Sequence, residues 1–459
     1  MTVLIAGAGP TGLTLAIDLA RRGLAVRIVD KATEFFNGSR GDGLQPRTLE
    51  VFDDLGVVDE VIRQGIDMPT LHIHLDGIEV DQRRMREPVD PTPDIPYPNG
   101  RMLAQSRTEE ILRAKLASYG VQVELDTAIV GFTQDASGVL AELSTGETVE
   151  ATYLVGADGG GSFVRKQLGI AFEGTTDDSI KVLIGDVAAD GLDHDKGYWF
   201  AGRENPMQGI VLTPLSGGDQ FQLASPIVDE DREPTLEVLQ DLMDTYAGPG
   251  FAKLRDLTWV TVWRPNVRLA ERFRVGRVFI AGDAAHVHPP TGGQGLNTGV
   301  QDAYNLGWKL ADGREEILAT YETERRTNAA RVLGISEDLM QKHLDGDESA
   351  LERGENTRQL DISYRDPADP RPLTSGDRAP DAHLTDANGN HLRLFDLLRG
   401  PHETLLRFNP STPATHPHTV DLTHPATASG ASYVSPTAFA AYHASDGDEI
   451  LIRPDGYLA

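Results

Sequence analysis

The sequence predicts a mixed α/β fold in which three segments, far apart in the chain, each supply a short buried strand. Each segment is a short apolar run that ends in glycine or Gly-Asp, at residues 2–7, 152–159 and 278–283. Runs of this length suit strands that are buried on both faces. A strand-rich block separates the last two segments, so we expect it to be inserted into the first domain.

The N-terminal segment has the pattern of a dinucleotide-binding turn. Gly7-x-Gly9-x-x-Gly12 follows a predicted strand at 2–6 and opens a helix. The first glycine permits the turn, the second lets a pyrophosphate approach the backbone, and the third lets the helix pack closely on the strand. The phosphate would lie on the free N–H groups of the helix N-terminus.

A second predicted strand, 25–29, ends at Asp30, 18 residues after Gly12. An acid at about this distance is expected to bind a ribose hydroxyl. The alternative interpretation of Asp30 is an ordinary acid at a strand end.

Residues 278–299 indicate which dinucleotide binds. Asp283 ends a strand, where a carboxylate can accept a hydrogen bond from a ribityl hydroxyl. The run 289–299 reads Pro-Pro-Thr-Gly-Gly-Gln-Gly-Leu-Asn-Thr-Gly and precedes a predicted helix. Its backbone N–H groups suit the electron-rich edge of a reduced flavin, which favours FAD.

A metal site is the alternative for Asp283, His286 and His288, because these residue types are common ligands. Two histidines separated by one residue point in opposite directions in an extended segment. The flavin already explains the glycine-rich loop, so we expect no metal and a structural hydrogen-bonding role for His286.

Further motifs extend the pattern. Residues 40–47 read Arg-Gly-Asp-Gly-Leu-Gln-Pro-Arg, residues 101–105 read Arg-Met-Leu-Ala-Gln, and residues 158–165 begin with Asp-Gly and include Ser162 and Arg165. Together with the glycine-rich segments, they resemble the FAD-dependent aromatic hydroxylases of the p-hydroxybenzoate hydroxylase fold. The resemblance covers nearly the whole chain. It implies a Rossmann-type FAD-binding domain with an inserted strand-rich substrate domain and a small C-terminal thioredoxin-like domain.

The resemblance also implies FAD contacts. Arg40, Arg101 and Gln105 correspond to residues near the adenosine and the flavin ring, although a surface salt bridge is the alternative for either arginine. The complete predicted set of cofactor-binding residues is Gly7, Gly9, Pro10, Thr11, Gly12, Asp30, Lys31, Arg40, Arg101, Gln105, Asp158, Gly159, Asp283, Pro290, Gly293, Gly295, Leu296 and Asn297.

The elements follow in order from hydrophobic periodicity and turn residues. Helices are predicted at 46–55 and 57–64, and a half-buried strand at 71–80, where apolar and polar side chains alternate. A proline- and acid-rich loop, 86–99, precedes an amphipathic helix at 108–119. The remaining predicted elements are strands at 121–125, 129–134, 139–143, 148–150, 152–155, 182–187, 197–200, 209–214, 220–224 and 257–264, and helices at 236–246, 300–311 and 315–345.

Three domains are expected from this order. The FAD-binding domain comprises residues 1–70, 101–178 and 266–365, the substrate domain 71–100 and 179–265, and the shortened thioredoxin-like domain 366–459. We expect the last of these to be dispensable for flavin chemistry. The substrate is expected at the junction of the first two domains. Its predicted walls, for which ordinary core packing is the alternative, are Phe200, Met207, Phe221, Trp263 and Pro290.

Composition limits the function classes. The chain has 459 residues, too many for a single core, and a net charge of −28, which disfavours nucleic acid and anionic membranes as partners. It has no cysteine, so disulfides and thiolate chemistry are excluded. We expect no signal peptide and no transmembrane segment, and therefore a cytoplasmic enzyme. A homodimer is compatible with the sequence, which does not determine the oligomeric state.

The resemblance implies an FAD monooxygenase. NADPH or NADH reduces the flavin, O₂ adds at flavin C4a, and the hydroperoxide hydroxylates a phenolic or polyketide-like aromatic substrate. We find no second Gly-x-Gly-x-x-Gly after a strand, which agrees with transient docking of NAD(P)H on the FAD domain in this family. The alternatives are a Baeyer–Villiger or antibiotic-inactivating oxygenase, a non-redox cyclase with a structural flavin, and a flavin-binding module without chemistry.

Overall fold

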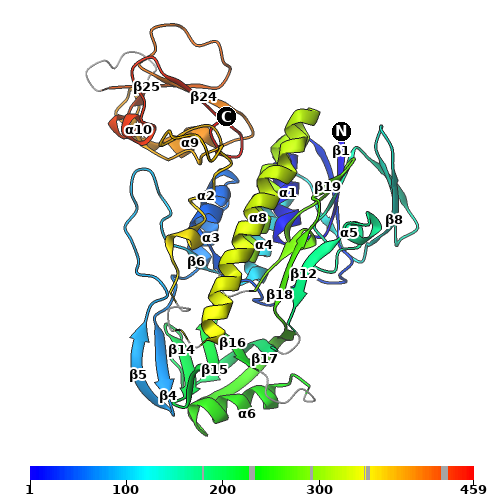
Figure 1. The fold of residues 1–459 in the computed structure, drawn as a ribbon, viewed down its shortest axis with the longest axis vertical. Helices are drawn as coiled ribbons and strands as arrows, with labels where there is room; N and C mark the ends of the chain where they lie inside the picture. Colours follow the sequence, from blue (N-terminus) through cyan, green and yellow to red (C-terminus); the bar gives the residue numbers. More distant parts are fainter. Residues whose placement is uncertain (178–179, 227–232, 290–292, 346, 348–351, 425–432) are drawn as a thin grey trace.

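The largest unit of the fold surrounds a six-stranded sheet (Figure 1). The computed structural model describes the whole chain except residues 178–179, 227–232, 290–292, 346, 348–351 and 425–432. In spatial order the strands are β19 (Arg274–Val275), β20 (Val278–Ile280), β11 (Tyr153–Gly156), β1 (Thr2–Ala6), β2 (Ala25–Val29) and β7 (Val123–Glu124). All neighbours are parallel except β19, which is antiparallel to β20. The three glycine-terminated segments therefore end at one edge of the sheet.

Helices and smaller sheets cover this sheet. α1 packs against α4 and α7, and the sheet β10-β9-β8 contacts β1 through β10. The helices are α1 (Pro10–Arg21), α2 (Pro46–Asp54), α3 (Val58–Gln64), α4 (Gln105–Ser118), α5 (Phe163–Gln167), α7 (Gly295–Asp312) and α8 (Glu315–Leu344), with 3₁₀ turns η1 (Gly282–Ala284) and η4 (Glu355–Arg358). The smaller sheets are formed by β8 (Ile129–Gln134), β9 (Val139–Leu143) and β10 (Thr148–Ala151), by β12 (Phe172–Thr176), β18 (Asn266–Ala270) and β21 (His286–Val287), and by β3 (Gly43–Leu44) and β6 (Arg101–Met102).

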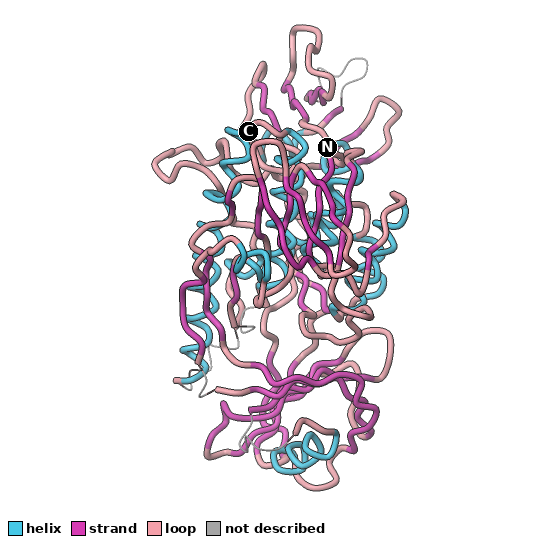
Figure 2. Tube along the Cα trace, turned by 90° about the vertical axis from the view of Figure 1, so that its right-hand side faces the viewer, coloured by secondary structure: helices cyan, strands magenta, loops and turns pink. Residues whose placement is uncertain are grey.

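A seven-stranded sheet forms the second unit, with one helix, α6 (Leu236–Ala247), on its far side (Figure 2). Its core lies between the sheet and α6 and includes Leu239 and Met243. In spatial order the strands are β17 (Lys253–Trp263), β13 (Val182–Asp190), β16 (Gln220–Pro226), β15 (Asn205–Pro214), β14 (Gly197–Gly202), β4 (Leu71–Leu75) and β5 (Ile78–Arg83).

The strand predicted at 71–80 is instead a hairpin of β4 and β5. Asp76 and Gly77 both have positive φ, of 53° and 76°. An Asp-Gly pair in this conformation makes the two-residue turn that joins antiparallel strands. The turn signal therefore overrides the continuous alternation of apolar and polar residues.

The C-terminal unit contains a six-stranded sheet with its own apolar core. Whether it is thioredoxin-like stays a prediction, as do the domain boundaries. In spatial order its strands are β23 (His391–Arg393), β22 (His383–Thr385), β26 (Tyr433–Val434), β25 (Thr419–Thr423), β24 (Thr404–Phe408) and β27 (Glu449–Ile452), with helices α9 (Leu394–Leu398) and α10 (Pro436–Ala441).

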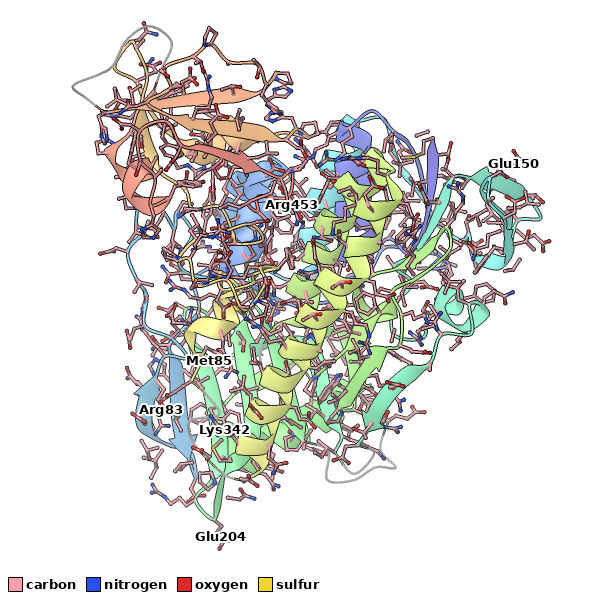
Figure 3. All side chains as sticks on the ribbon, turned by 45° about the horizontal axis from the view of Figure 1, so that its top comes forward. Arg83, Met85, Glu150, Glu204, Lys342 and Arg453 are labelled. Carbon is pink, nitrogen blue, oxygen red and sulfur yellow. The ribbon has the colours of Figure 1, made fainter. Side chains whose placement is uncertain are left out.

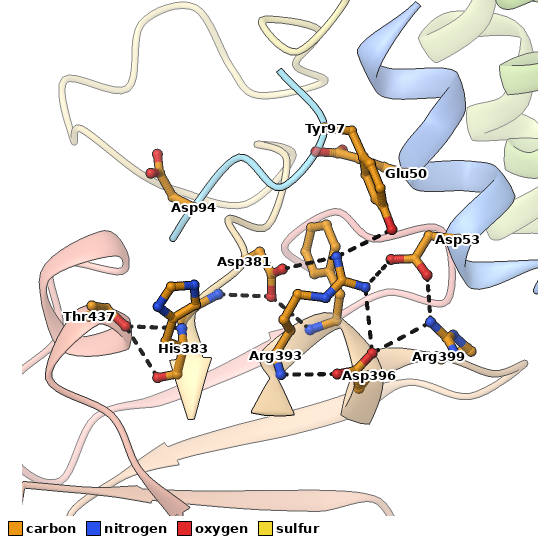
Figure 4. Close-up of polar contacts among 12 residues, drawn as sticks. Glu50, Asp53, Asp94, Tyr97, Asp381, His383, Arg393, Asp396, Arg399 and Thr437 are labelled. Atoms are coloured by element: carbon orange, nitrogen blue, oxygen red, sulfur yellow. Dashed lines mark hydrogen bonds and ion pairs between the residues drawn. The ribbon is translucent and has the colours of Figure 1, made fainter. Parts of the chain in front are cut away.

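Buried ion pairs attach the C-terminal unit to α2 (Figure 4). Asp53 of α2 bonds Arg393 at 2.6 Å and Arg399 at 2.5 Å, although only 3% of its side chain is exposed. Glu50, one turn earlier, pairs with Arg378 at 2.6 Å. Charges this deeply buried are stable only with their partners, so the C-terminal unit should stabilise α2, whereas its dispensability for flavin chemistry stays a prediction.

A further ion pair links this unit to α8. Arg453, labelled in Figure 3 beside the long helix, lies 3.0 Å from Glu324.

Among the residues that the structure describes, no helix combines the length and apolar character that crossing a membrane requires.

Candidate functional site

The turn after β1 has the geometry of a dinucleotide-binding turn. Gly7 has φ +101°, and a Cβ there would overlap the carbonyl oxygen of Ala157, next to β11. A Cβ at Gly12 would overlap the Gly7 carbonyl oxygen. A Cβ at Gly9, in contrast, would meet nothing within 4 Å. Two glycines are thus required by the fold itself, and the third borders open space.

That open space faces the start of α1. This helix start can bind a phosphate because its first backbone N–H groups have no capping side chain. Gly9 is the N-cap and Pro10 the first residue, and no side chain caps the helix. Its first N–H groups are free to hold an anion. Asp30 holds the turn in place, accepting hydrogen bonds from the N–H of Ala8 at 2.7 Å and of Ala32 at 2.9 Å. Lys31 beside it is exposed.

Thr11 joins the N-terminal turn to the Gly-Asp segment. Its hydroxyl lies so close to Gly282 and Gly299 that a Cβ at either glycine would overlap it. Gly282 has φ +60°, a conformation that favours glycine. The start of α1, the η1 turn and the first part of α7 therefore meet at one point.

Asp283 follows Gly282 and is exposed, whereas Gly282 and Ala284 on either side of it are buried. Although its surface is accessible, protein surrounds the carboxylate. Desolvation by this surrounding protein raises the pKa of Asp283, while the charges of His286 and Arg40 oppose the shift. A carboxylate in such a space is suited to accept hydrogen bonds from a bound polyol chain.

Asp302 of α7 stabilises the Gly-Asp turn through hydrogen bonds, a role that the sequence patterns did not reveal. It accepts hydrogen bonds from Gly282 N at 3.0 Å, His286 Nε2 at 2.7 Å and Arg325 Nε at 2.7 Å. His286 thus has the structural hydrogen bond that we expected. An acid within a helix that follows a glycine-rich loop is the signal that could have indicated Asp302.

Asp158 is bonded within its own segment, and its contact with the cofactor stays a prediction. Its carboxylate accepts hydrogen bonds from Ser162 Oγ at 2.5 Å and from Phe163 N at 2.7 Å, which caps α5. Arg165 of α5 donates to the carbonyl of Ala284 at 2.8 Å and so connects this segment to η1. Gly159 borders open space, because a Cβ there would meet nothing within 4 Å.

The first turn of α7, which follows the glycine-rich loop, is bonded to the segment around β3. Asn297 donates to the carbonyl of Gly43 at 2.8 Å and accepts from Gln45 N at 2.8 Å. The side chain of Leu296 lies against Gly41, 3.4 Å from where a Cβ would be. In the loop, Gly293 accepts from Asn297 Nδ2 at 2.8 Å, and Gly295 begins α7. Pro290, predicted for both cofactor and substrate, lies outside the described residues.

The two predicted arginines occupy different environments. Arg40 is exposed, and its guanidinium lies over the rings of Phe36 and Trp259, with centroid distances of 5.2 and 5.9 Å. Arg101 instead bonds Asp67 and the backbone carbonyls of Ile62 and Gly65, so its guanidinium stabilises the C-terminal end of α3.

Gln105 lies near both Gly41, which follows Arg40, and the buried acid Glu109. Its Nε2 donates to Glu109 at 2.8 Å, and its Oε1 lies 3.4 Å from where a Cβ of Gly41 would be. Burial raises the pKa of Glu109 to about 7, although Gln105 and Arg113 oppose the shift.

The register of the seven-stranded sheet corrects two of the predicted substrate walls. Phe200 and Phe221 are 0% and 1% exposed and belong to the core under α6. They therefore face away from the FAD-binding unit. Because side chains alternate along a strand, a large aromatic residue in a strand pattern fits either face.

Trp263 lies on the opposite face. It pairs with Val182, two positions before Ile184 and four before Asp186, which contacts the FAD-binding unit through Ser39. Paired residues share a face, so Trp263 remains a candidate for a substrate wall. Met207 lies in the irregular part of β15 between Asn205 and Gly209, so register does not assign its face and its role in a substrate wall stays a prediction.

The turns and loops at the strand ends define a dinucleotide-binding protein of the flavoprotein class. The free N–H groups at α1 and the enclosed carboxylate of Asp283 have the chemistry that FAD binding requires. The chain belongs to the FAD-binding-domain family, whose profile matches residues 1–336.

Similar proteins agree. The chain is 43% identical over its whole length, and over 96% of the relative, to a flavin-dependent monooxygenase of Mycobacteroides abscessus. It is similar to the structure of aklavinone-11 hydroxylase with FAD and aklavinone, at a TM-score of 0.81 and 27% identity over 100% of this chain and 94% of that one. It is also similar to the Diels-Alderase PyrE3, at a TM-score of 0.74 and 27% identity over 100% and 95% of the two chains. The protein is thus an FAD-dependent monooxygenase by family, and FAD is its cofactor.

Proposed function

We propose that the protein uses NAD(P)H and O₂ to hydroxylate a phenolic or polyketide-like aromatic substrate. The observation that carries the proposal is the loop 39–45, which is bonded both to the first turn of α7, directly after the glycine-rich loop, and to the seven-stranded sheet. A flavin ring at the first of these would face a substrate on the second.

When bound, reduced FAD supplies the activation of O₂. The chain's residues would bind and orient the reactants. The N–H groups at the start of α1 would hold the pyrophosphate, and Asp283 would bind a ribityl hydroxyl. Arg40 would contact the cofactor where the two units meet. Trp263 and Met207 would bound the aromatic substrate and exclude water from the reacting atoms.

The test is oxygen labelling with the FAD-loaded protein. We expect oxidation of NADPH or NADH and one ¹⁸O atom per product when phenols and aromatic polyketides are incubated under ¹⁸O₂. A Gly9→Val preparation, which should lack FAD, is the matched control. Product without label would contradict hydroxylation.

A non-redox cyclase is the second candidate, because the similar structure of PyrE3 is described as a Diels-Alderase. Conversion of a substrate at an undiminished rate without NAD(P)H and O₂ would favour this function. Anaerobic reduction of the flavin by NAD(P)H, accelerated by the substrate, would favour the monooxygenase.

A further inference from the structure

The segment 354–365, which follows α8 in the chain and precedes the C-terminal unit, contains a residue with an unusual backbone conformation. Gln359 follows the 3₁₀ turn η4 and has φ +61°, in the left-handed region that glycine adopts most readily. The residue is 1% exposed. A residue other than glycine stays in this region where its surroundings fix it, and such positions cluster at functional sites.

The amide of Gln359 joins this segment to the start of α7. Its Nε2 donates to Gln294 Oε1 at 2.6 Å and to Thr298 Oγ1 at 3.3 Å. Its Oε1 accepts a hydrogen bond from Gln301 Nε2 at 2.5 Å. All three partners are buried, and their spacing of four and three residues places them on one face of the helix. One side chain therefore contacts the N-cap and the first two turns of α7.

The backbone on both sides of Gln359 is fixed by other contacts. Before it, Arg358 donates to the carbonyl of Pro98 from Nε at 2.9 Å and from Nη2 at 2.7 Å. After it, the hydroxyl of Tyr364 accepts a hydrogen bond from Arg325 Nη1 at 2.6 Å. These contacts, together with the amide network, explain how the left-handed conformation of Gln359 persists.

Gln294 is the residue at which this network meets the predicted cofactor site. It lies between Gly293 and Gly295, which are both predicted to bind FAD, and it is the N-cap of α7. Its Nε2 donates to the carbonyl of Thr357 at 3.1 Å, so the segment contacts both polar atoms of its amide. Among the described side chains, none caps α7, so the first N–H groups of this helix can face an electron-rich ring edge.

The position of the start of α7 should affect the two redox states of the cofactor differently. A reduced flavin carries more electron density at its pyrimidine edge than an oxidised flavin does, and the positive end of a helix stabilises it. Because this stabilisation is confined to the first turn of a helix, it depends on where that turn lies. Displacing the start of α7 should therefore weaken the binding of reduced FAD more than that of oxidised FAD.

We propose that Gln359 is a positioning residue for the cofactor, which holds Gln294 and the first turns of α7 where they stabilise reduced FAD more than oxidised FAD. This role goes beyond the hydroxylation proposed above, because it concerns the cofactor alone and requires no substrate. It adds to the flavin site a residue that lies 65 positions after Gln294 in the sequence.

The test measures FAD affinity and the flavin midpoint potential of the full-length protein without substrate. Gln359→Leu removes the three hydrogen bonds and keeps a buried side chain. We expect the ratio of the affinities for reduced and oxidised FAD to fall about 3- to 10-fold, as the loss of hydrogen bonds of ordinary strength predicts. For a two-electron couple, this change makes the midpoint potential about 14–30 mV more negative.

A second variant, Gln359→Gly, separates the hydrogen bonds from the backbone conformation. It removes the same hydrogen bonds, but glycine adopts φ +61° without strain. We expect it to fold at least as well as Gln359→Leu, judged by circular dichroism, and to show the same fall in the ratio of affinities. It keeps the proposal testable if the leucine variant does not fold.

Gln240→Leu is the matched control. The amide of Gln240 in α6 also makes three hydrogen bonds: to Asp244 at 2.9 Å, to the carbonyl of Ala252 at 3.0 Å and from Leu254 N at 2.7 Å. This helix lies on the far side of the seven-stranded sheet (Figure 2). The substitution should destabilise the protein in urea but leave the flavin potential unchanged.

An unchanged flavin potential in a folded Gln359 variant would overturn the proposal, and so would an equal shift of the potential in Gln240→Leu. Folded Gln359 variants that bind neither redox state of FAD would also reject it, because the proposal predicts a difference between the two states. Absence of labelled oxygen from the products would reject the hydroxylase but not this role, since the potential is measured without turnover.

Discussion

Replacing Asp302 by asparagine is expected to destabilise the fold and the FAD site together. The carboxylate is fully buried and accepts hydrogen bonds from Gly282, His286 and Arg325 at 3.0, 2.7 and 2.7 Å. Asparagine has a similar shape but only one acceptor oxygen and no charge. Arg325, also 0% exposed, would lose its counter-charge. Removing one partner of a buried ion pair costs about 3–5 kcal/mol.

The same carboxylate should contribute to the stability of the protein in a pH-dependent manner. Burial alone would raise the pKa of Asp302, but the charges and hydrogen bonds of His286 and Arg325 lower it below its usual value. A depressed pKa in the folded state stabilises the protein above the unfolded pKa, about 3.9, and this contribution is lost as the pH falls through the folded pKa. The destabilisation by Asp302→Asn should therefore be complete at neutral pH and shrink in strong acid.

Urea denaturation followed by circular dichroism, together with fluorescence titration of FAD, tests this reasoning. Asp312→Asn is the matched control, because Asp312 ends the same helix and forms a surface pair with Arg314 at 2.7 Å. Surface pairs contribute about 0–1 kcal/mol, so the control should unfold almost as the wild type does. If both variants shift the free energy of unfolding equally, and FAD affinity is unchanged, the central role of Asp302 is refuted.

The remaining predictions concern the cofactor and the C-terminal unit. Gly9→Val should fold normally by circular dichroism yet bind no FAD. Gly7→Val should lower the unfolding midpoint, because it adds atoms where the backbone is already packed. A yellow Gly9→Val protein would contradict the pyrophosphate site. Asp283→Ala should weaken FAD binding about 10- to 100-fold in a fluorescence titration, as expected for a charge-assisted hydrogen bond, and an unchanged affinity would remove Asp283 from the site. Deleting residues 366–459 should remove the ion pairs that Arg378, Arg393 and Arg399 form with Glu50 and Asp53 and lower the unfolding midpoint; a truncated chain as stable as the wild type would show that the interface is dispensable.

The part of the fold that sequence predicted best is the part governed by local signals. The three glycine-terminated strands are adjacent, because short apolar runs and their turns encode strands that are buried on both faces. The hairpin at 71–83 was missed because the alternation of Leu71, Ile73 and Leu75 was extended past Asp76-Gly77, a pair typical of two-residue turns that shifts the apolar phase by one residue. Alternation reports burial but not chain reversal.

The aromatic residues show a second limit. Phe200 and Trp263 both come from strands of the same sheet, and hydrophobicity alone does not distinguish them. Their faces depend on register, which pairs Phe200 with Ile210 on the α6 side and Trp263 with Val182 on the other. A one-residue change of register would exchange the two faces, so a substrate wall cannot be assigned before the pairing is known.

Asp42 illustrates why the chemistry of a site is harder to predict than its location. The surrounding Gly-x-Gly segment placed it near the flavin by resemblance alone. Burial is the largest cause of the raised pKa of its carboxyl, and the charge of Asp186 on the inserted sheet adds to it. The hydrogen bonds that connect the two segments span 147 residues of sequence, between Ser39 and Asp186. No periodicity or spacing connects positions so far apart, so the pKa of such a carboxyl follows only from the packing of segments that are distant in the chain.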